Sequence, residues 1–184
     1  MDESWREMGP ICARLTEAFA PLPPFQLSYE PKDLRPLITI GSLMELDPAF
    51  MEALDITCVV TCFDASKLED KLDVPRLARS RYPEVVMTVS CCPDAARDNH
   101  DSFVSVMEQL QHGHQSVLFH CVKGDRLSVI VGVAAAMALN TYELSDRGCS
   151  EVNARLRSTG RALRPGDWDK VRKLKSIWEA WLFS

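Results

Sequence analysis

Residues Leu118–Ser128 read LFHCVKGDRLS and decide how the whole chain is interpreted. The stretch leaves an apolar, strand-like run at a His-Cys pair, turns through a glycine and enters a second apolar run that is typical of a buried helix. A cysteine between a strand end and a helix start lies among free backbone N–H groups and at the positive end of the helix dipole. Both effects favour the thiolate and attract phosphate. The pattern therefore predicts a phosphate-binding loop around Cys121.

Strand-like and helix-like stretches alternate on both sides of this loop. Strands are predicted at 37–43, 56–63, 85–89 and 117–120, and helices at 47–54, 101–111, 129–139, 143–156 and 168–183. The stretch 129–139 is almost wholly apolar, so that helix should be buried on all sides. The alternation predicts an α/β fold with a mostly parallel central sheet flanked by helices.

The chain is interpreted as one domain over 36–184 with an extension over 1–35. Its 184 residues, 46% of them hydrophobic, can bury one substantial core. Within the extension a short helix is predicted over about 5–19. The proline-rich Pro21–Pro24 that follows is a plain linker or a polyproline ligand.

Charge and cysteine content narrow the class of protein. A net charge of -5 and a pI near 5.4 argue against a general nucleic-acid or membrane-surface binder. The chain has seven cysteines, an odd number, and neither a secretory leader nor a long membrane-spanning run is seen. We therefore expect an intracellular protein with free thiols, cytoplasmic or nuclear. Cys58 and Cys62 lack a second Cys/His pair at metal spacing. We expect no metal and no cofactor.

The loop resembles the signature of the dual-specificity phosphatases, His-Cys-x-x-Gly-x-x-Arg-Ser/Thr. His120, Cys121, Gly124 and Ser128 match it, but Leu127 stands where that family places its phosphate-clamping arginine.

Other parts of the chain carry the same resemblance. Residues Ile38–Leu43 with the strand Ile56–Val60, and Arg164-Pro165 ahead of the last helix, occur in the order of that family. The resemblance covers 37–183 and implies a three-layer, dual-specificity-phosphatase-like fold.

The resemblance also assigns roles within the loop, whose other members are Val122, Lys123 and Asp125. Cys121 would be the nucleophile, unless it is an inert buried cysteine. His120 would hold the loop through hydrogen bonds to backbone carbonyls. Ser128 would hydrogen-bond the thiolate, cap the following helix, or do both.

The resemblance implies that two catalytic roles are damaged in this chain. Losing one preorganised donor typically costs about 3 kcal/mol, and Leu127 replaces a bidentate cation. Arg126 is one position away, about 100° around a helix, and could substitute only in a reshaped loop, although Arg126 and Lys123 leave the rim positive. The family's general acid lies two residues before a proline, where this chain has Cys91. Asp94 could replace it, or could belong to a solvated loop with Asp98 and Asp101.

Two further groups of residues indicate a function less specifically than the loop does. The first is a basic segment that forms a solvated face or engages an acidic partner: Arg155, Arg157, Arg161 and Arg164. The second recurs at helical spacing and is the core face of the last helix or a protein-binding stripe: Leu174, Ile177, Trp178, Trp181 and Leu182.

The sequence favours a pseudophosphatase, catalytically dead or severely impaired, that works by binding a protein partner, a phosphorylated ligand, or sulfate and phosphate in the loop. The alternative is an active cysteine-dependent protein phosphatase that uses Cys121, Asp94 and Arg126 in a rearranged loop. A third interpretation is a structural protein with a vestigial pocket.

Overall fold

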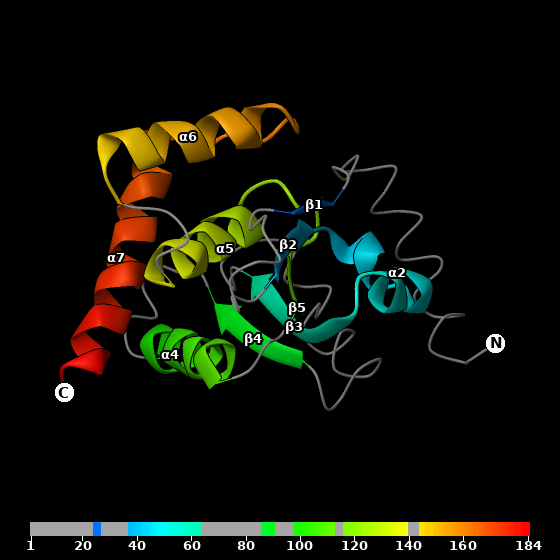
Figure 1. Cartoon of the computed structure of the whole chain (residues 1–184), viewed down its shortest axis with the longest axis horizontal. Coiled ribbons are helices and arrows are strands. Elements are labelled where there is room, and N and C mark those ends of the chain that lie inside the picture. Colours follow the sequence, from blue (N-terminus) through cyan, green and yellow to red (C-terminus); the bar gives the residue numbers. More distant parts are fainter. Residues whose placement is uncertain (1–23, 27–36, 64–85, 91–97, 113–115, 140–143) are drawn as a thin grey trace.

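A five-stranded sheet lies at the centre of the molecule (Figure 1). The computed structural model describes residues 24–26, 37–63, 86–90, 98–112, 116–139 and 144–184. Its strands are β1 (Phe25–Gln26), β2 (Leu37–Gly41), β3 (Ile56–Phe63), β4 (Val86–Ser90) and β5 (Ser116–His120). They lie in the order β1-β2-β5-β3-β4, with β2, β5, β3 and β4 parallel and β1 antiparallel to β2. The predicted, mostly parallel sheet is confirmed.

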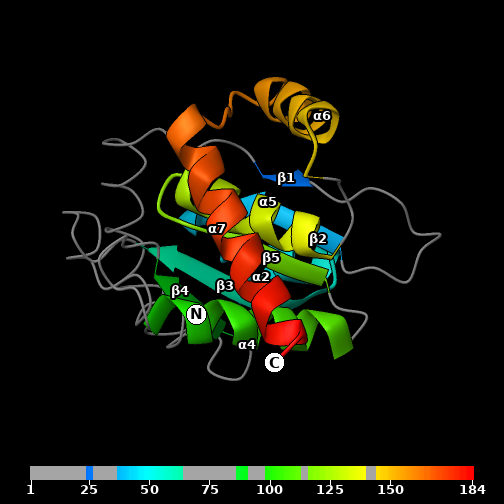
Figure 2. The same cartoon turned by 90° about the vertical axis from the view of Figure 1, so that its left-hand side faces the viewer.

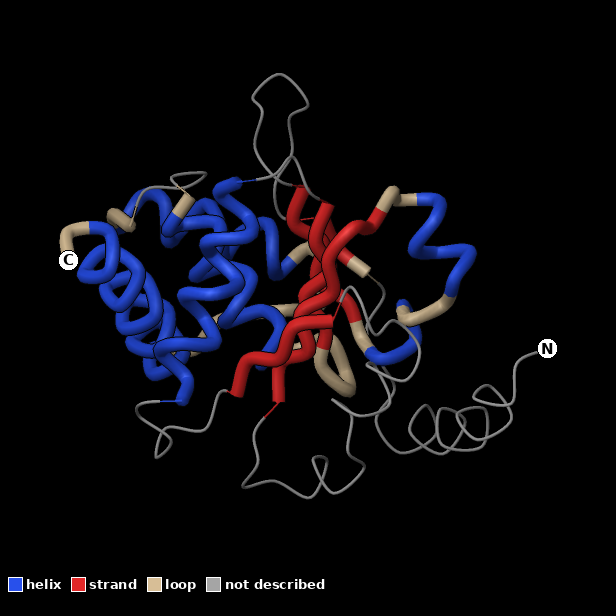
Figure 3. Tube along the Cα trace, turned by 90° about the horizontal axis from the view of Figure 1, so that it is seen from below, coloured by secondary structure: helices blue, strands red, loops and turns tan. Residues whose placement is uncertain are grey.

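Helices lie on both sides of the sheet. They are the 3₁₀-helix η1 (Leu43–Glu45), α2 (Pro48–Ala53), α4 (Asp98–His112), α5 (Leu127–Ala138), α6 (Asp146–Arg157) and α7 (Pro165–Leu182). Figure 2 shows α4, α5 and α7 over one face, and Figure 3 shows the short helices η1 and α2 on the opposite side. This arrangement is the expected three-layer fold.

The core lies between the sheet and the helix α5. Every residue from Leu127 to Met137 is buried, as expected for the most apolar helix of the chain. Phe119 of β5, Phe103 of α4 and Val171 of α7 belong to the same core cluster. Helix α5 is thus packed between the sheet and α7, and its first turn, next to Cys121, is fixed with it.

Some element boundaries differ from the sequence-based expectations. Helix α7 begins three residues earlier than predicted, because Pro165 fits the first helical position and the Asp167 carboxylate accepts the Arg164 backbone N–H. Helix α6 begins at Asp146 instead of residue 143, after its N-cap Ser145. Strand β1 was not predicted. The predicted helix over 5–19 and Pro21–Pro23 lie outside the described residues.

The apolar stripe of α7 is only partly core. Trp178 is buried, but Trp181 stacks on it with ring centroids 4.8 Å apart and is exposed, as is Leu182. The core interpretation is therefore wrong for these last two residues, which lie at the C-terminal end of α7 (Figure 1).

Candidate phosphate-binding site

Cys121 lies where β5 ends beside β2, and it is 4% exposed. Its backbone N–H donates to the Gly41 carbonyl at 3.4 Å, and the Leu43 N–H donates to the Val122 carbonyl at 3.3 Å. These two bonds tie the loop to the turn that follows β2. The strand pairing thus continues past the end of the sheet and sets the direction in which the loop leaves it.

Gly124 allows the loop to turn within this space. Its φ is +73°, a left-handed conformation that side chains disfavour. A Cβ atom on Gly124 would lie 2.7 Å from the Gly41 carbonyl carbon, closer than two carbon atoms can approach. Two independent features therefore require the glycine that the motif contains: its positive φ and the close approach of the end of β2.

The Cys121 Sγ lies 3.3 Å from the Ser128 Oγ, so the predicted pairing of thiol and hydroxyl is present. The single hydrogen of the Ser128 hydroxyl can be donated to this sulfur or to the Gly41 carbonyl, 3.4 Å from the Oγ, and the side chain is fully buried. Ser128 is not the helix cap, since α5 begins at Leu127 with Arg126 as N-cap. Arg126 makes no capping bond with its side chain, which leaves the first-turn N–H groups without that partner.

His120, the last residue of β5, is fully buried. Its Nε2 lies 2.8 Å from the Thr61 Oγ1, and its Nδ1 has no hydrogen-bond partner among the described residues. Among the described residues, His120 contacts this hydroxyl on β3 and no backbone carbonyl. Burial lowers the pKa of His120 from 6.5 to about 3, so the ring is neutral and cannot supply positive charge to the loop.

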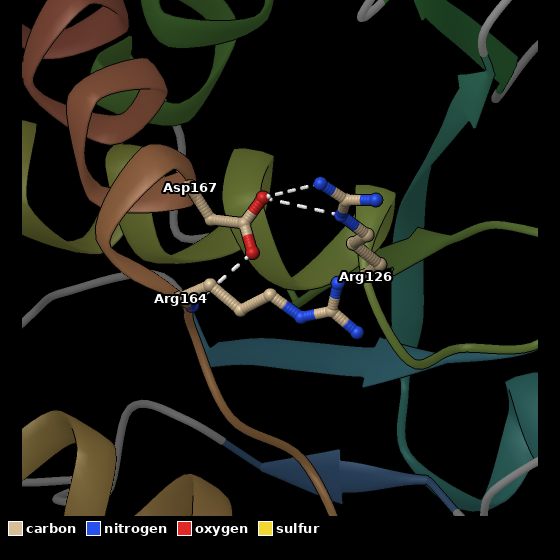
Figure 4. Close-up of polar contacts among 3 residues, drawn as sticks. All are labelled: Arg126, Arg164 and Asp167. Carbon is tan, nitrogen blue, oxygen red and sulfur yellow. Dashed lines mark hydrogen bonds and ion pairs between the residues drawn. The ribbon is translucent and has the colours of Figure 1, made fainter.

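Leu127, at the position of the clamping arginine, is 8% exposed and belongs to the core cluster. Arg126 beside it extends to α7, where its Nε and Nη2 donate to the Asp167 Oδ1 at 3.1 and 2.9 Å (Figure 4). The other Asp167 oxygen accepts the Arg164 N–H at 3.1 Å. The Arg126 guanidinium is thus neutralised by a buried carboxylate.

Arg161 is a site residue that sequence reasoning missed. It was grouped with the basic segment expected to be solvated or to meet an acidic partner, yet it is 1% exposed. Its Nε donates to the Gly124 carbonyl at 2.7 Å. Burial lowers its pKa, and Glu45, Cys121 and Asp125 act against this shift electrostatically. Nothing in the local pattern separates Arg161 from the neighbouring arginines, because its partners are distant in sequence.

The remaining predicted residues are spread around the loop. Lys123 is half-buried and Asp125 is exposed. Asp94, the candidate general acid, lies outside the described residues, while Asp101 is exposed on α4. In the parts of the chain that the structure describes, no three metal-binding side chains cluster, and no helix is both long and apolar enough to span a membrane.

Several solved structures share this architecture. PTPMT1 superposes with a TM-score of 0.55 at 15% identity, over 82% of this chain and 95% of its own. Human DUSP28 gives a TM-score of 0.52 at 16% identity, over 80% of this chain and 93% of its own. The human tyrosine phosphatase-like serine/threonine/tyrosine-interacting protein gives 0.51 at 13% identity, over 80% and 96%. No protein-family model and no curated protein matches the sequence.

The likeness covers most of this chain and nearly all of each similar structure. Together with the parallel sheet and the cysteine loop at the end of β5, it gives the chain the fold of the dual-specificity phosphatases.

Proposed function

We propose that this chain is a pseudophosphatase, a dual-specificity-phosphatase fold that binds a phosphorylated ligand or a protein partner at the loop 120–128 and hydrolyses phosphate esters slowly or not at all. The observation that carries the proposal is the placement of Leu127. An aliphatic side chain packed into the core occupies the position from which an arginine would hold two phosphate oxygens. Its neighbour Arg126 is bonded to Asp167.

The rest of the loop supports anion binding. Gly124 retains the backbone turn, Ser128 pairs with Cys121, and the first turn of α5 lacks a side-chain cap from its N-cap residue. Backbone N–H groups at a helix start bind phosphate without needing the missing arginine. The loop can therefore bind phosphate although it lacks the arginine that hydrolysis needs.

Hydrolysis of p-nitrophenyl phosphate near neutral pH tests the loss of catalysis. We expect no rate above that of Cys121→Ser, because the transition state lacks its bidentate cation. Leu127→Arg should raise the rate or the affinity for inorganic phosphate by about tenfold or more, and Leu127→Met, which keeps an apolar side chain of similar size, should do neither.

Three results would change the proposal. A wild-type rate typical of a phosphatase, abolished by Cys121→Ser, favours the active alternative, in which Arg126 has to leave Asp167. No gain in Leu127→Arg would mean that the general acid or the loop shape is defective as well. Absence of phosphate binding in calorimetry, in the wild type and in Leu127→Arg alike, favours a structural protein with a vestigial pocket.

A further inference from the structure

Arg161 brings a permanent charge to the backbone of the loop. It lies between α6 and α7, far in sequence from Cys121, and its side chain is almost completely buried. Arginines are rarely buried, and a guanidinium keeps its proton in proteins. Its Nε–H bonds to the carbonyl of Gly124, the residue on which the loop turns. A buried cation therefore contacts the backbone three residues after Cys121.

The other charged groups near the loop are less buried than Arg161, paired or neutral, and Lys123 of the loop is half-buried. Arg126 is paired with Asp167, and His120 is neutral. Of the acidic groups that act on Arg161, Asp125 is exposed and so is screened by solvent and salt. Glu45 is buried, but its carboxylate also accepts the backbone N–H and the hydroxyl of Ser42. Because these donors are neutral, they leave the carboxylate charge in place, and Glu45 offsets part of the Arg161 charge.

We infer that Arg161 supplies, from behind the loop, the positive charge that the phosphate-binding loop lacks at Leu127. It is a positioning residue, because it acts through the Gly124 carbonyl and through its charge without touching a bound phosphate. In a water-poor interior a charge acts over longer distances than at the surface, so Arg161 favours an anion in the loop, whether the Cys121 thiolate or a ligand phosphate. The phosphate part of this inference rests on the proposed function.

Two readouts on Arg161→Gln, Arg161→Lys and the exposed control Arg157→Gln test this role. The first is the rate of Cys121 alkylation by iodoacetamide at pH 6 and pH 9.5, followed by mass spectrometry. Cys58, buried with its pKa raised to about 11, is the unreactive reference in the same sample. The second is the affinity for inorganic phosphate, measured by calorimetry.

We expect Arg161→Gln to lower the alkylation rate at pH 6 and the phosphate affinity by about tenfold each, with little change in alkylation at pH 9.5. Arg161→Lys should lose about threefold, because a lysine keeps the charge but cannot reproduce the guanidinium fork. Arg157→Gln should match the wild type. If Arg161→Gln fails to fold, the comparison of Arg161→Lys with Arg157→Lys decides.

The outcomes separate this inference from the proposed function. If the wild type binds no phosphate but alkylation still falls in Arg161→Gln, the proposed phosphate binding is wrong and the role of Arg161 stands. If both readouts stay at wild-type values in the folded Arg161 variants, the inference is overturned, and phosphate binding can still hold.

Discussion

His120 shows how a single buried side chain links the fold to pH. In the folded protein it is neutral, with a pKa of about 3, whereas an unfolded histidine titrates near 6.5. Between these values the unfolded state binds one more proton than the native state, so acid favours unfolding. The stability that His120 contributes is present above pH 6.5 and is lost as the pH falls toward 3.

We therefore predict that the free energy of unfolding falls between pH 6.5 and pH 4 by up to about 1.4 kcal/mol per pH unit from this residue. Urea unfolding across this range gives the slope. His120→Asn cannot take up the proton, so its stability should depend less on pH than that of the wild type, even if it is lower throughout. Equal slopes for the two proteins would show that His120 is not the group responsible.

At the scale of elements, Asp167 joins the start of α7 to the loop. One oxygen receives the Arg126 fork and the other receives the Arg164 N–H, while the carboxylate is 2% exposed. Removing a buried acceptor leaves its donors unsatisfied. Asp169, two residues further on the same helix, is exposed and pairs with Arg172 across one turn.

The contrast predicts that Asp167→Ala lowers the free energy of unfolding by about 1–3 kcal/mol and Asp169→Ala by less than about 0.5 kcal/mol. Chemical denaturation of both variants measures this. Asp167→Ala should also leave the rate of p-nitrophenyl phosphate hydrolysis unchanged. Arg126 is released from Asp167 in this variant, but it still lies one residue before Leu127, the position of the phosphate-clamping arginine. A clear gain in rate would instead support the alternative in which Arg126 serves the loop.

At the scale of the whole molecule, the sequence predicted the features that depend on local pattern. The β-branched run of β3 and the apolar run of α5 each specify their own structure, and the motif placed Cys121, Gly124 and Ser128 together. Long-range contacts were not predictable in this way. Arg161 bonds to the carbonyl of Gly124, 37 residues earlier, and the exposure of Trp181 depends on which elements distant in sequence cover α7.

The packing of α5 on the sheet leads to a last prediction. At Gly132 the helix approaches β2 so closely that a Cβ atom would lie 3.2 Å from the Ile40 side chain and 3.6 Å from Phe119. Both neighbours are fully buried, so a larger side chain has no space to enter. Gly166 in the first turn of α7 is the matched control, since a Cβ atom there would meet nothing within 4 Å.

Gly132→Leu should therefore lower the free energy of unfolding by about 1–3 kcal/mol or more through overpacking, although leucine favours a helix more than glycine does. Gly166→Ala should be neutral or stabilising by up to about 1 kcal/mol. Urea unfolding of both variants tests the difference, and unchanged stability in Gly132→Leu would show that α5 can move away from β2. Because α5 carries Leu127 and Ser128 in its first turn, such a movement would also displace the loop. The close packing at Gly132 is thus one of the contacts that hold Ser128 beside Cys121.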